Sequence, residues 1–218
     1  MKDLFPDGVV FVQADDVLAA EPLRPEEAAD AVRMGDARRR EFALGRACAR
    51  RALAGLGMDA EPLRRGADRA PRWPDGVIGS LTHTDGFCAA AVARQGSLLA
   101  LGLDAESSPL SARAALRVLD ASERAQIDRL ASPPALGFAT VAFSAKESIY
   151  KALYPLCGRK LVFGDAAIEI DPRAHTVRIT LRARGAGALP PGATIEGRYA
   201  LTPTCVVTSV VVRRARAY

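Results

Sequence analysis

An α+β fold is predicted for this chain of 218 residues, because segments with helical periodicity alternate with groups of short strands that turn signals separate. The order helix, loop, antiparallel strands occurs twice, once in each half, although the halves differ too much residue by residue to establish a repeat. Hydrophobic residues make up 49% of the chain, so it can bury a substantial core without disulfides or metals. We expect two α+β halves, 1–103 and 104–218, packed into one compact protein.

The first half should contain two helices followed by three strands. Its elements are expected at 24–31 and 37–56 (helices), 62–76 (loop), and 77–82, 87–93 and 97–103 (strands). The helices are rich in Ala, Arg and Glu, and the second should stop at Gly55 or Gly57. Turn signals at Thr84-Asp85-Gly86 and Arg94-Gln95-Gly96 separate the three strands.

The second half should contain two long helices followed by four strands. Its elements are expected at 111–130 and 138–154 (helices), and 165–170, 175–182, 194–201 and 205–213 (strands). Ser132-Pro133-Pro134 breaks the helical pattern between the two helices, and Pro190-Pro191-Gly192 is typical of a turn.

Two carboxylates end the third strand of the first half. Leu98-Leu99-Ala100-Leu101 is an apolar run typical of a buried strand whose last residues emerge toward solvent. Side chains alternate along an extended segment, so Asp104 and Glu106 share one face. Oxygen ligands paired on one face suit a hard cation such as Mg²⁺. The spacing therefore predicts a metal site at these two carboxylates.

A predicted helix carries two of the few lysines. Phe143, Glu147, Tyr150 and Lys151 recur at intervals of three and four among strong helix formers. Glu147 and Lys151 are thus one turn apart, a spacing that is also typical of an exposed ion pair. The chain has 30 basic residues but uses lysine for four of them, two of which, Lys146 and Lys151, lie here. A compact ammonium can follow a phosphate as a point charge, so this retention of lysine indicates a phosphate-binding role.

Together these stretches resemble the paired signatures of the 4′-phosphopantetheinyl transferases, approximately G-[VI]-D-x-E and [FW]-x-x-K-E-[SA]-x-x-K. Residues 143–151 match the second signature without a gap, and the first departs only at Leu103 and Ala105, which are not ligand positions. Upstream, Gly79-Ser80-Leu81-Thr82-His83-Thr84 resembles the G-S-[LIV]-[ST]-H segment of the longer members. The stretches 38–50 and 73–77 resemble the enterobactin-synthase-associated and actinobacterial subgroup of the Sfp-type enzymes, and the whole match covers residues 36–163.

The resemblance implies a monomer of two similar α+β halves in a pseudo-twofold arrangement, with the active site in the cleft between them. It implies a Mg²⁺-dependent transfer of the 4′-phosphopantetheine arm of coenzyme A to a serine of an apo carrier protein, with release of adenosine 3′,5′-bisphosphate. The partners would be carrier proteins or carrier domains of fatty-acid, polyketide or nonribosomal-peptide synthases, siderophore synthesis included. The sequence does not distinguish among these carriers.

The same resemblance assigns roles to individual residues. It implies Asp104, Glu106 and Glu147 as metal ligands, and Asp104, Glu147 and Lys151 as catalytic residues. Lys146 and Lys151 would contact phosphate oxygens, and Glu147, directly or through a water molecule, is the expected base. The 3′-phosphate end of coenzyme A is expected to bind at Arg38, Arg46, Arg65, Thr82 and His83.

Several of these assignments have plainer alternatives. His83 at the end of an apolar strand is also typical of a hydrogen-bonded structural histidine, and the arginines of 38–51 are also typical of a solvated helix face. For the whole protein, the alternatives are a noncatalytic coenzyme A or nucleotide-binding protein and an Arg-rich nucleic-acid binder. The net charge of +5 suits anionic ligands generally, but aromatic residues make up only 6% of the chain, which disfavours nucleic acid as the partner.

Composition also predicts where the protein acts. Residues 1–6 lack the pattern of a secretory signal, and no apolar run approaches the length of about eighteen residues that a membrane span needs, so we expect a cytoplasmic protein. Cys48, Cys88, Cys157 and Cys205 form no C-x-x-C pair. We expect them to be reduced structural thiols, neither zinc ligands nor disulfides.

Overall fold

The structure, a computed structural model, describes residues 1–19, 21–59, 61–159, 161–182 and 189–214. Its elements are η1 (Lys2–Leu4), β1 (Val9–Gln13), α1 (Asp16–Ala19), α2 (Pro25–Asp30), α3 (Asp36–Gly55), β2 (Val77–Thr84), β3 (Phe87–Arg94), β4 (Leu98–Glu106), α4 (Ala112–Val118), α5 (Ala121–Asp128), α6 (Phe138–Cys157), η2 (Phe163–Asp165), β5 (Ala166–Asp171), β6 (Thr176–Leu181), β7 (Thr194–Leu201) and β8 (Val206–Arg213).

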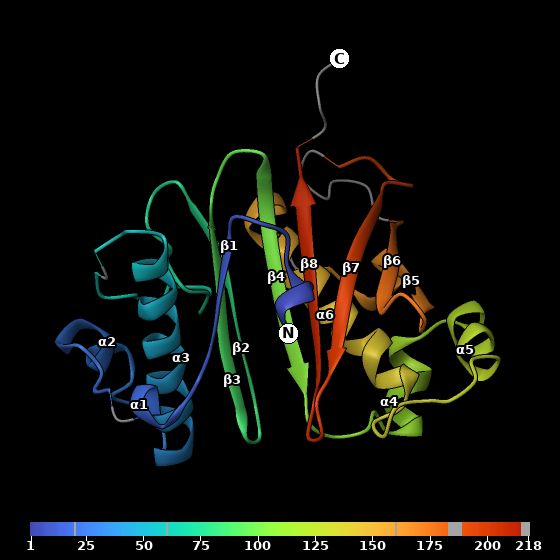
Figure 1. Cartoon of the computed structure of the whole chain (residues 1–218), viewed down its shortest axis with the longest axis horizontal. Helices are drawn as coiled ribbons and strands as arrows, with labels where there is room; N and C mark the ends of the chain where they lie inside the picture. Colours follow the sequence, from blue (N-terminus) through green and yellow to red (C-terminus); the bar gives the residue numbers. More distant parts are fainter. Residues whose placement is uncertain (20, 60, 160, 183–188, 215–218) are drawn as a thin grey trace.

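Two antiparallel sheets occupy the centre of the molecule, with α1, α2 and α3 at one end and α4 and α5 at the other (Figure 1). The smaller sheet has the strand order β1-β3-β2, and the larger has the order β4-β8-β7-β6-β5. This combination of helices with antiparallel sheets confirms the predicted α+β class.

Strand β3 organises the smaller sheet because it is apolar and buried on both faces. Its alternate residues point in opposite directions, so one set packs toward α3 and the other toward the larger sheet. The α3 side takes Cys88, Ala90 and Val92, and the other side takes Phe87, Ala89 and Ala91. Small side chains dominate both sets, which lets α3 and the larger sheet lie close to the strand.

Helix α6 covers one face of the larger sheet and supplies much of its core. Ala145, Ile149 and Leu153 are buried on this face of the helix. The helix lies so close to β4 that a Cβ atom at Gly102 would lie 1.8 Å from the Ser148 carbonyl oxygen. Only glycine fits at such a contact. The first residue of the G-x-D-x-E stretch therefore sets the distance between β4 and α6.

The two sheets meet at β2 and β4, where hydrogen bonds from side chains join the strands. Ser80 Oγ accepts a hydrogen bond from Leu103 N at 3.0 Å and donates to Leu103 O at 3.4 Å. Further along both strands, Thr84 Oγ1 lies 2.7 Å from Ser107 Oγ. Since these contacts advance in the same direction along β2 and β4, the carboxyl ends of the two strands lie side by side.

The single helix predicted over 111–130 is wrong, because the structure has two helices there, α4 and α5. Leu119 between them is extended, with φ −106° and ψ 133°. Asp120 Oδ1 then accepts a hydrogen bond from Glu123 N at 2.8 Å, and Glu123 Oε2 accepts one from Asp120 N at 2.8 Å. This reciprocal capping box starts a new helix after the break.

The other predicted helices and strands are confirmed to within a few residues. Helix α3 ends at Gly55, and α6 continues beyond its predicted end at 154 to Cys157, followed by Gly158 with φ +63°. The expected loop at 62–76 contains one isolated bridge, between Arg65 and Pro71. The elements η1, β1, α1 and η2 were not predicted, because segments of five residues or fewer are too short to show a period.

The predicted boundary between the halves falls inside β4, which pairs with β8 in the larger sheet. Both this boundary and the pseudo-twofold relation stay predictions. Within the described ranges, no helix is long and apolar enough to cross a membrane. Cys48, Cys88, Cys157 and Cys205 are free thiols, and all but Cys157 are buried.

Candidate functional site

The predicted residues converge where β2, β4 and α6 meet. Lys151 of α6 connects these elements, because its Nζ donates to three acceptors. It lies 3.3 Å from Leu81 O on β2, 3.0 Å from Leu103 O on β4 and 2.8 Å from Asp104 Oδ1. A single ammonium group therefore contacts both sheets at the ends of the strands that carry His83 and Asp104.

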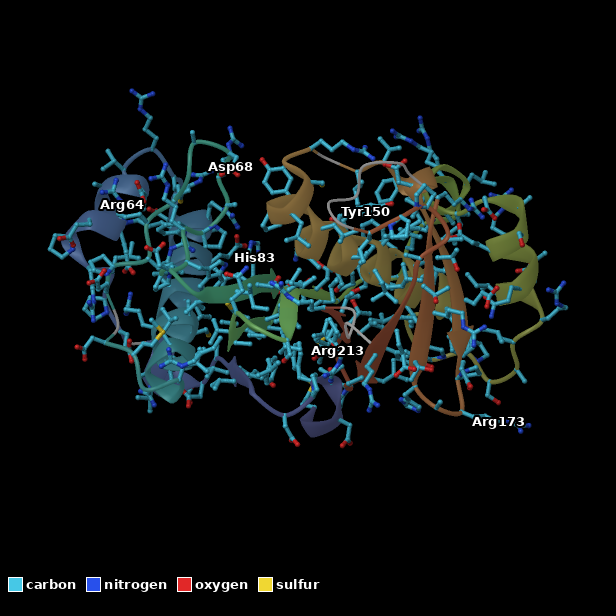
Figure 2. All side chains as sticks on the ribbon, turned by 90° about the horizontal axis from the view of Figure 1, so that it is seen from above. Arg64, Asp68, His83, Tyr150, Arg173 and Arg213 are labelled. Atoms are coloured by element: carbon cyan, nitrogen blue, oxygen red, sulfur yellow. The ribbon has the colours of Figure 1, made fainter. Side chains whose placement is uncertain are left out.

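Two adjoining cavities open at this junction, and both are lined by Arg69, Pro71, Leu81 and Lys151. The smaller cavity, of about 310 Å³, has charged walls, formed by Arg38, Glu41, Arg46, Arg65, His83, Asp104 and Glu106. The larger cavity, of about 1000 Å³, is mostly apolar and is lined by Trp73, Tyr150, Tyr154 and Phe163, with Glu147 and Lys151 at one side. In Figure 2, His83 lies between the part of the molecule that carries Asp68 and the helix that carries Tyr150.

Three carboxylates gather near Lys151 and affect one another. Asp104 is 6% exposed, and its Oδ2 accepts a hydrogen bond from Ser144 Oγ at 2.8 Å. Burial, and then the negative charge of Asp104, raise the pKa of Glu106 to about 7. The same two causes raise the pKa of Glu147. Like charges held together in a half-buried place favour a bound cation.

The three carboxylates fit a hard divalent cation, because they supply oxygen ligands and an excess of negative charge. In the part of the chain that the structure describes, no group of three His, Cys, Asp or Glu side chains is arranged to hold a metal ion. Both oxygens of Asp104 are instead hydrogen-bonded, one to Lys151 and one to Ser144. Each carboxylate oxygen has more than one lone pair, so Asp104 could keep these hydrogen bonds and still ligate a cation.

A buried arginine marks the cationic end of the smaller cavity. Arg46 is 4% exposed, and its Nε has no hydrogen-bond partner among the described residues. Its guanidinium carbon lies 4.1 Å from the centroid of the Phe42 ring. Burial lowers the pKa of Arg46 to about 10, so the group stays cationic at neutral pH. Glu27 and Asp30 act on Arg46 through their charges, but their carboxylates accept hydrogen bonds from other residues. The Nε group without a partner therefore suits a bound anion.

His83 and Arg38 lie together at the smaller cavity. Arg38 Nη1 contacts His83 Nε2 and donates a hydrogen bond to Glu41 Oε2 at 2.9 Å. The His83 side chain is 39% exposed, so it faces the cavity and is not a core residue. Burial, and then the charge of Arg38, lower the pKa of His83. The imidazole is therefore neutral at neutral pH and can offer a hydrogen bond to a ligand.

The remaining predicted binding residues also reach this cavity. Thr82 is buried at its wall, and Arg65 approaches from the loop at 62–76. Asp30 of α2 fixes the start of that loop, because its Oδ2 accepts hydrogen bonds from Arg65 N at 2.8 Å and from Arg64 Nε at 3.1 Å. Its Oδ1 accepts a second hydrogen bond from the Arg64 guanidinium at 3.1 Å.

Lys146 is the predicted site residue that lines neither cavity, and its expected contact with phosphate stays a prediction without support from this geometry. Its side chain is 1% exposed, and its Nζ donates to Phe163 O and Ala166 O, both at 2.8 Å. The same atom lies 2.8 Å from Glu123 Oε1. These three acceptors satisfy the three N–H groups of the ammonium. The reason is helical geometry, since position 146 lies on the same face of α6 as the buried Ile149.

Arg69 was not predicted, although it lines both cavities. Its φ of +75° is unusual for a residue other than glycine. Hydrogen bonds from Gly66 N to Ala70 O at 2.8 Å and from Arg69 N to Gly66 O at 2.9 Å hold the turn. Such backbone strain is frequent at ligand sites. The sequence offered only the Pro, Gly and Arg content of this segment, which predicts a loop but no role.

Comparison with known proteins shows sequence similarity to one family along most of the chain. Residues 26–93 match the family model described as the 4′-phosphopantetheinyl transferase N-terminal domain, and residues 100–195 match the 4′-phosphopantetheinyl transferase superfamily. The chain is 44% identical over 195 residues to 4′-phosphopantetheinyl transferase Svp of Streptomyces mobaraensis, which covers 87% of this chain and 78% of that protein. It is 38% identical over 194 residues to 4′-phosphopantetheinyl transferase PptT of Mycobacterium tuberculosis, covering 86% and 85%. Enterobactin synthase component D of Salmonella typhi is 39% identical over 121 residues, covering 54% and 49%.

Proposed function

This chain belongs to the 4′-phosphopantetheinyl transferase family, and from that premise we propose that it transfers the 4′-phosphopantetheine arm of coenzyme A to a serine of an apo carrier protein. The serine oxygen forms a bond to the phosphorus that bears the arm. The bond from that phosphorus to the bridging pyrophosphate oxygen breaks, and adenosine 3′,5′-bisphosphate leaves. The carrier gains the arm as a phosphodiester.

The observation that carries this proposal is the position of Lys151 where a charged cavity adjoins a larger apolar one. Coenzyme A has the same order of chemical parts, with a phosphorylated nucleotide at one end, a pyrophosphate in the middle and a long uncharged arm at the other end. Lys151 therefore suits the pyrophosphate, the smaller cavity suits the nucleotide end, and the larger cavity suits the arm.

At the nucleotide end, Arg46 supplies a buried positive charge, and its Nε has no hydrogen-bond partner among the described residues. A 3′-phosphate there would pair with the guanidinium in a charge-assisted hydrogen bond. Arg38, Arg65, Thr82 and His83 line the same cavity and complete the binding set that we propose. Arg69, which lines both cavities, joins this set as a residue near the pyrophosphate.

At the pyrophosphate, we assign Asp104, Glu106 and Glu147 as the residues that would hold Mg²⁺. Bound there, the ion would neutralise charge on the pyrophosphate and so favour departure of the leaving phosphate. Lys151 contributes a positive charge from the protein itself, because its ammonium group lies at the same place and can donate to a phosphate oxygen. Ser144 keeps Asp104 oriented through its hydrogen bond at 2.8 Å.

Glu147 is our candidate for the general base that accepts the serine proton. It lines the larger cavity beside Lys151, where the arm and an incoming hydroxyl group would meet. Burial and the charge of Asp104 raise the pKa of Glu147, which makes its carboxylate a better proton acceptor near neutral pH. The proton would pass to a carboxylate oxygen of Glu147, directly or through one water molecule.

We also propose which proteins this chain modifies, that it is a monomer, and where in the cell it acts. The acceptors are carrier proteins or carrier domains of nonribosomal-peptide, polyketide or fatty-acid synthases, and the name of the relative from Salmonella typhi favours testing siderophore-synthase carriers among them. We propose that the protein acts as a monomer. Coenzyme A and apo carriers occur together in the cytoplasm, so this activity belongs there.

Intact-protein mass spectrometry tests the proposed activity. An apo peptidyl carrier protein and an apo acyl carrier protein are each incubated with this protein, coenzyme A and Mg²⁺, and a matched reaction contains EDTA. We expect a gain of one phosphopantetheine mass on at least one carrier, with none in EDTA. Coenzyme A binding without any gain on either carrier would favour the noncatalytic alternative.

A further inference from the structure

Lys146 is a buried cation that the proposed mechanism does not use. It lies one residue before Glu147 on α6, but its side chain lines neither cavity. The ammonium sits 2.8 Å from Glu123 Oε1 on α5 and donates to the carbonyl oxygens of Phe163 and Ala166 at 2.8 Å. Burying a cation is unfavourable unless every N–H group finds an acceptor. Here all three N–H groups of the Lys146 ammonium have an acceptor, so the fold places this buried lysine specifically.

One of the two carbonyl oxygens that Lys146 contacts, that of Phe163, belongs to a wall of the larger cavity, and the other, that of Ala166, lies at the start of β5. Leu161, Val162 and Phe163 line this cavity and lead directly into η2 and β5. The Phe163 ring lies 6.0 Å from that of Phe143 and 5.8 Å from that of Tyr150, measured between centroids. The cavity wall formed by 161–163 thus packs on the exposed side of α6. Lys146, on the buried side of α6, donates a hydrogen bond to the backbone of this wall at Phe163 O.

A second side chain of α6 holds the same wall. Tyr150 donates a hydrogen bond from its hydroxyl group to Val162 O at 2.8 Å. Glu123 adds a third link, because its Oε1 accepts a hydrogen bond from Ile168 N on β5 at 2.9 Å. The wall at 161–163 is therefore held between α6 and the start of β5.

We propose that Lys146 is a positioning residue that fixes the wall at 161–163, and so sets the shape of the cavity for the pantetheine arm, without contacting a phosphate. This inference rests on the proposed function, because the ligand of the larger cavity is assigned there. It gives separate roles to the two lysines of the K-E-S-x-x-K stretch. Lys151 acts on the pyrophosphate, and Lys146 acts on the uncharged arm through the protein backbone.

The two roles differ in which ligand they affect. Adenosine 3′,5′-bisphosphate contains the nucleotide end of coenzyme A but lacks the arm. A loosened wall should therefore weaken the binding of coenzyme A and leave the binding of the bisphosphate unchanged. A lysine that contacts phosphate would weaken both ligands, and a general loss of stability would also affect both.

The test compares the two ligands by isothermal titration calorimetry with the unaltered protein, Lys146→Met and the double variant Lys146→Met/Glu123→Gln. The double variant removes both buried charges, and the side-chain oxygen of the new glutamine can still accept the hydrogen bond from Ile168 N. If the single variant fails to fold, the double variant can still be tested. Arg46→Ala is the matched control, since both ligands carry the 3′-phosphate. All titrations contain Mg²⁺, and circular dichroism checks that each variant is folded.

We expect the dissociation constant of coenzyme A to rise about tenfold or more in a folded Lys146 variant, while that of adenosine 3′,5′-bisphosphate changes less than about twofold. Arg46→Ala should weaken both ligands together. A similar loss for both ligands in the Lys146 variants, or no loss for either, would overturn the inference. The proposed function fails separately, namely if the unaltered protein binds neither ligand.

Discussion

Lys151 Nζ lies 2.8 Å from Asp104 Oδ1, and this contact joins α6 to β4 at the point where the two cavities meet. The Asp104 carboxylate is buried and the Lys151 side chain is one-third exposed, so the ammonium can move toward solvent while the carboxylate stays in place. A divalent cation bound to Asp104 would lie close to this ammonium group, and the two positive charges would compete for the negative charge of the same carboxylate.

This competition predicts an unusual effect of Lys151→Met. In the absence of coenzyme A, the variant should bind Mn²⁺ or Mg²⁺ more tightly than the unaltered protein, because the internal cation that neutralises Asp104 is gone. Calorimetric titration with each metal measures the affinity. Arg178→Met, which removes an exposed cation paired with Glu169 at 3.8 Å, should leave metal affinity unchanged. Equal or weaker metal binding by the Lys151 variant would show that the two cations do not compete.

The same variant should be a poor transferase. Removing a positive charge that acts on the leaving pyrophosphate should lower kcat about 100-fold or more. Single-turnover assays with a carrier that the unaltered protein modifies would measure this rate. A variant with nearly normal kcat would remove Lys151 from the reacting centre.

Glu147→Gln should abolish transfer while largely preserving the fold. The substitution keeps the shape of a half-buried side chain but removes both the proposed proton acceptor and a proposed metal ligand. Intact-protein mass spectrometry of the carrier measures the transfer, and thermal unfolding measures stability. Glu169→Gln makes the same chemical change at an exposed position outside the two cavities and should be fully active. Near-normal turnover by the Glu147 variant would contradict the assigned role.

Arg46→Ala should mainly weaken the binding of coenzyme A. Loss of a buried guanidinium that pairs with the 3′-phosphate should raise the KM for coenzyme A by about 10- to 100-fold and change kcat much less. Arg51→Ala is the control on the same helix, because Arg51 is 54% exposed and pairs with Glu21 at 3.4 Å. An unchanged KM for coenzyme A would show that Arg46 does not bind the 3′-phosphate.

The acidic residues predict a dependence of stability on pH. Because the pKa of Glu106 is about 7 in the folded protein and near 4.5 ordinarily, the folded state holds the proton more tightly. The stability that this proton contributes is present below about pH 4.5 and is lost as the pH rises through about 7. Glu106→Gln should therefore lose less stability than the unaltered protein between pH 5 and pH 8, measured as melting temperature in EDTA. Parallel loss in both proteins would show that Glu106 does not titrate in this range.

Much of the site could be predicted because its residues follow one another on regular elements. Alternation along a strand predicts that Asp104 and Glu106 share one face of the strand, and helical spacing predicts that Glu147 and Lys151 share one face of the helix. Short motifs were therefore enough to predict these four candidate residues. Lys146 shows the limit of that reasoning. Its position relative to Ile149 would have placed it on the buried face of α6, but the resemblance assigned it to phosphate together with Lys151.

The features that were missed depend on contacts between distant residues. The position of Arg69 depends on a turn within an irregular loop, and the wall at 161–163 depends on packing against α6, which no local period reports. The break before α5 was different, because Asp120 and Glu123 form a capping box that is readable in the sequence. The apolar pattern across 111–130 continues through this break and predicts one helix, whereas the capping box starts a second one.

A crystal structure of the protein with coenzyme A and Mg²⁺ tests most directly the claim that Lys151 lies between a nucleotide cavity and an arm cavity. We predict the 3′-phosphate at Arg46, the pyrophosphate beside Lys151 with the metal on the carboxylates of Asp104, Glu106 and Glu147, and the arm along Tyr150 and Phe163. Coenzyme A bound with its 3′-phosphate away from Arg46, or with its pyrophosphate out of reach of Lys151, would contradict that claim.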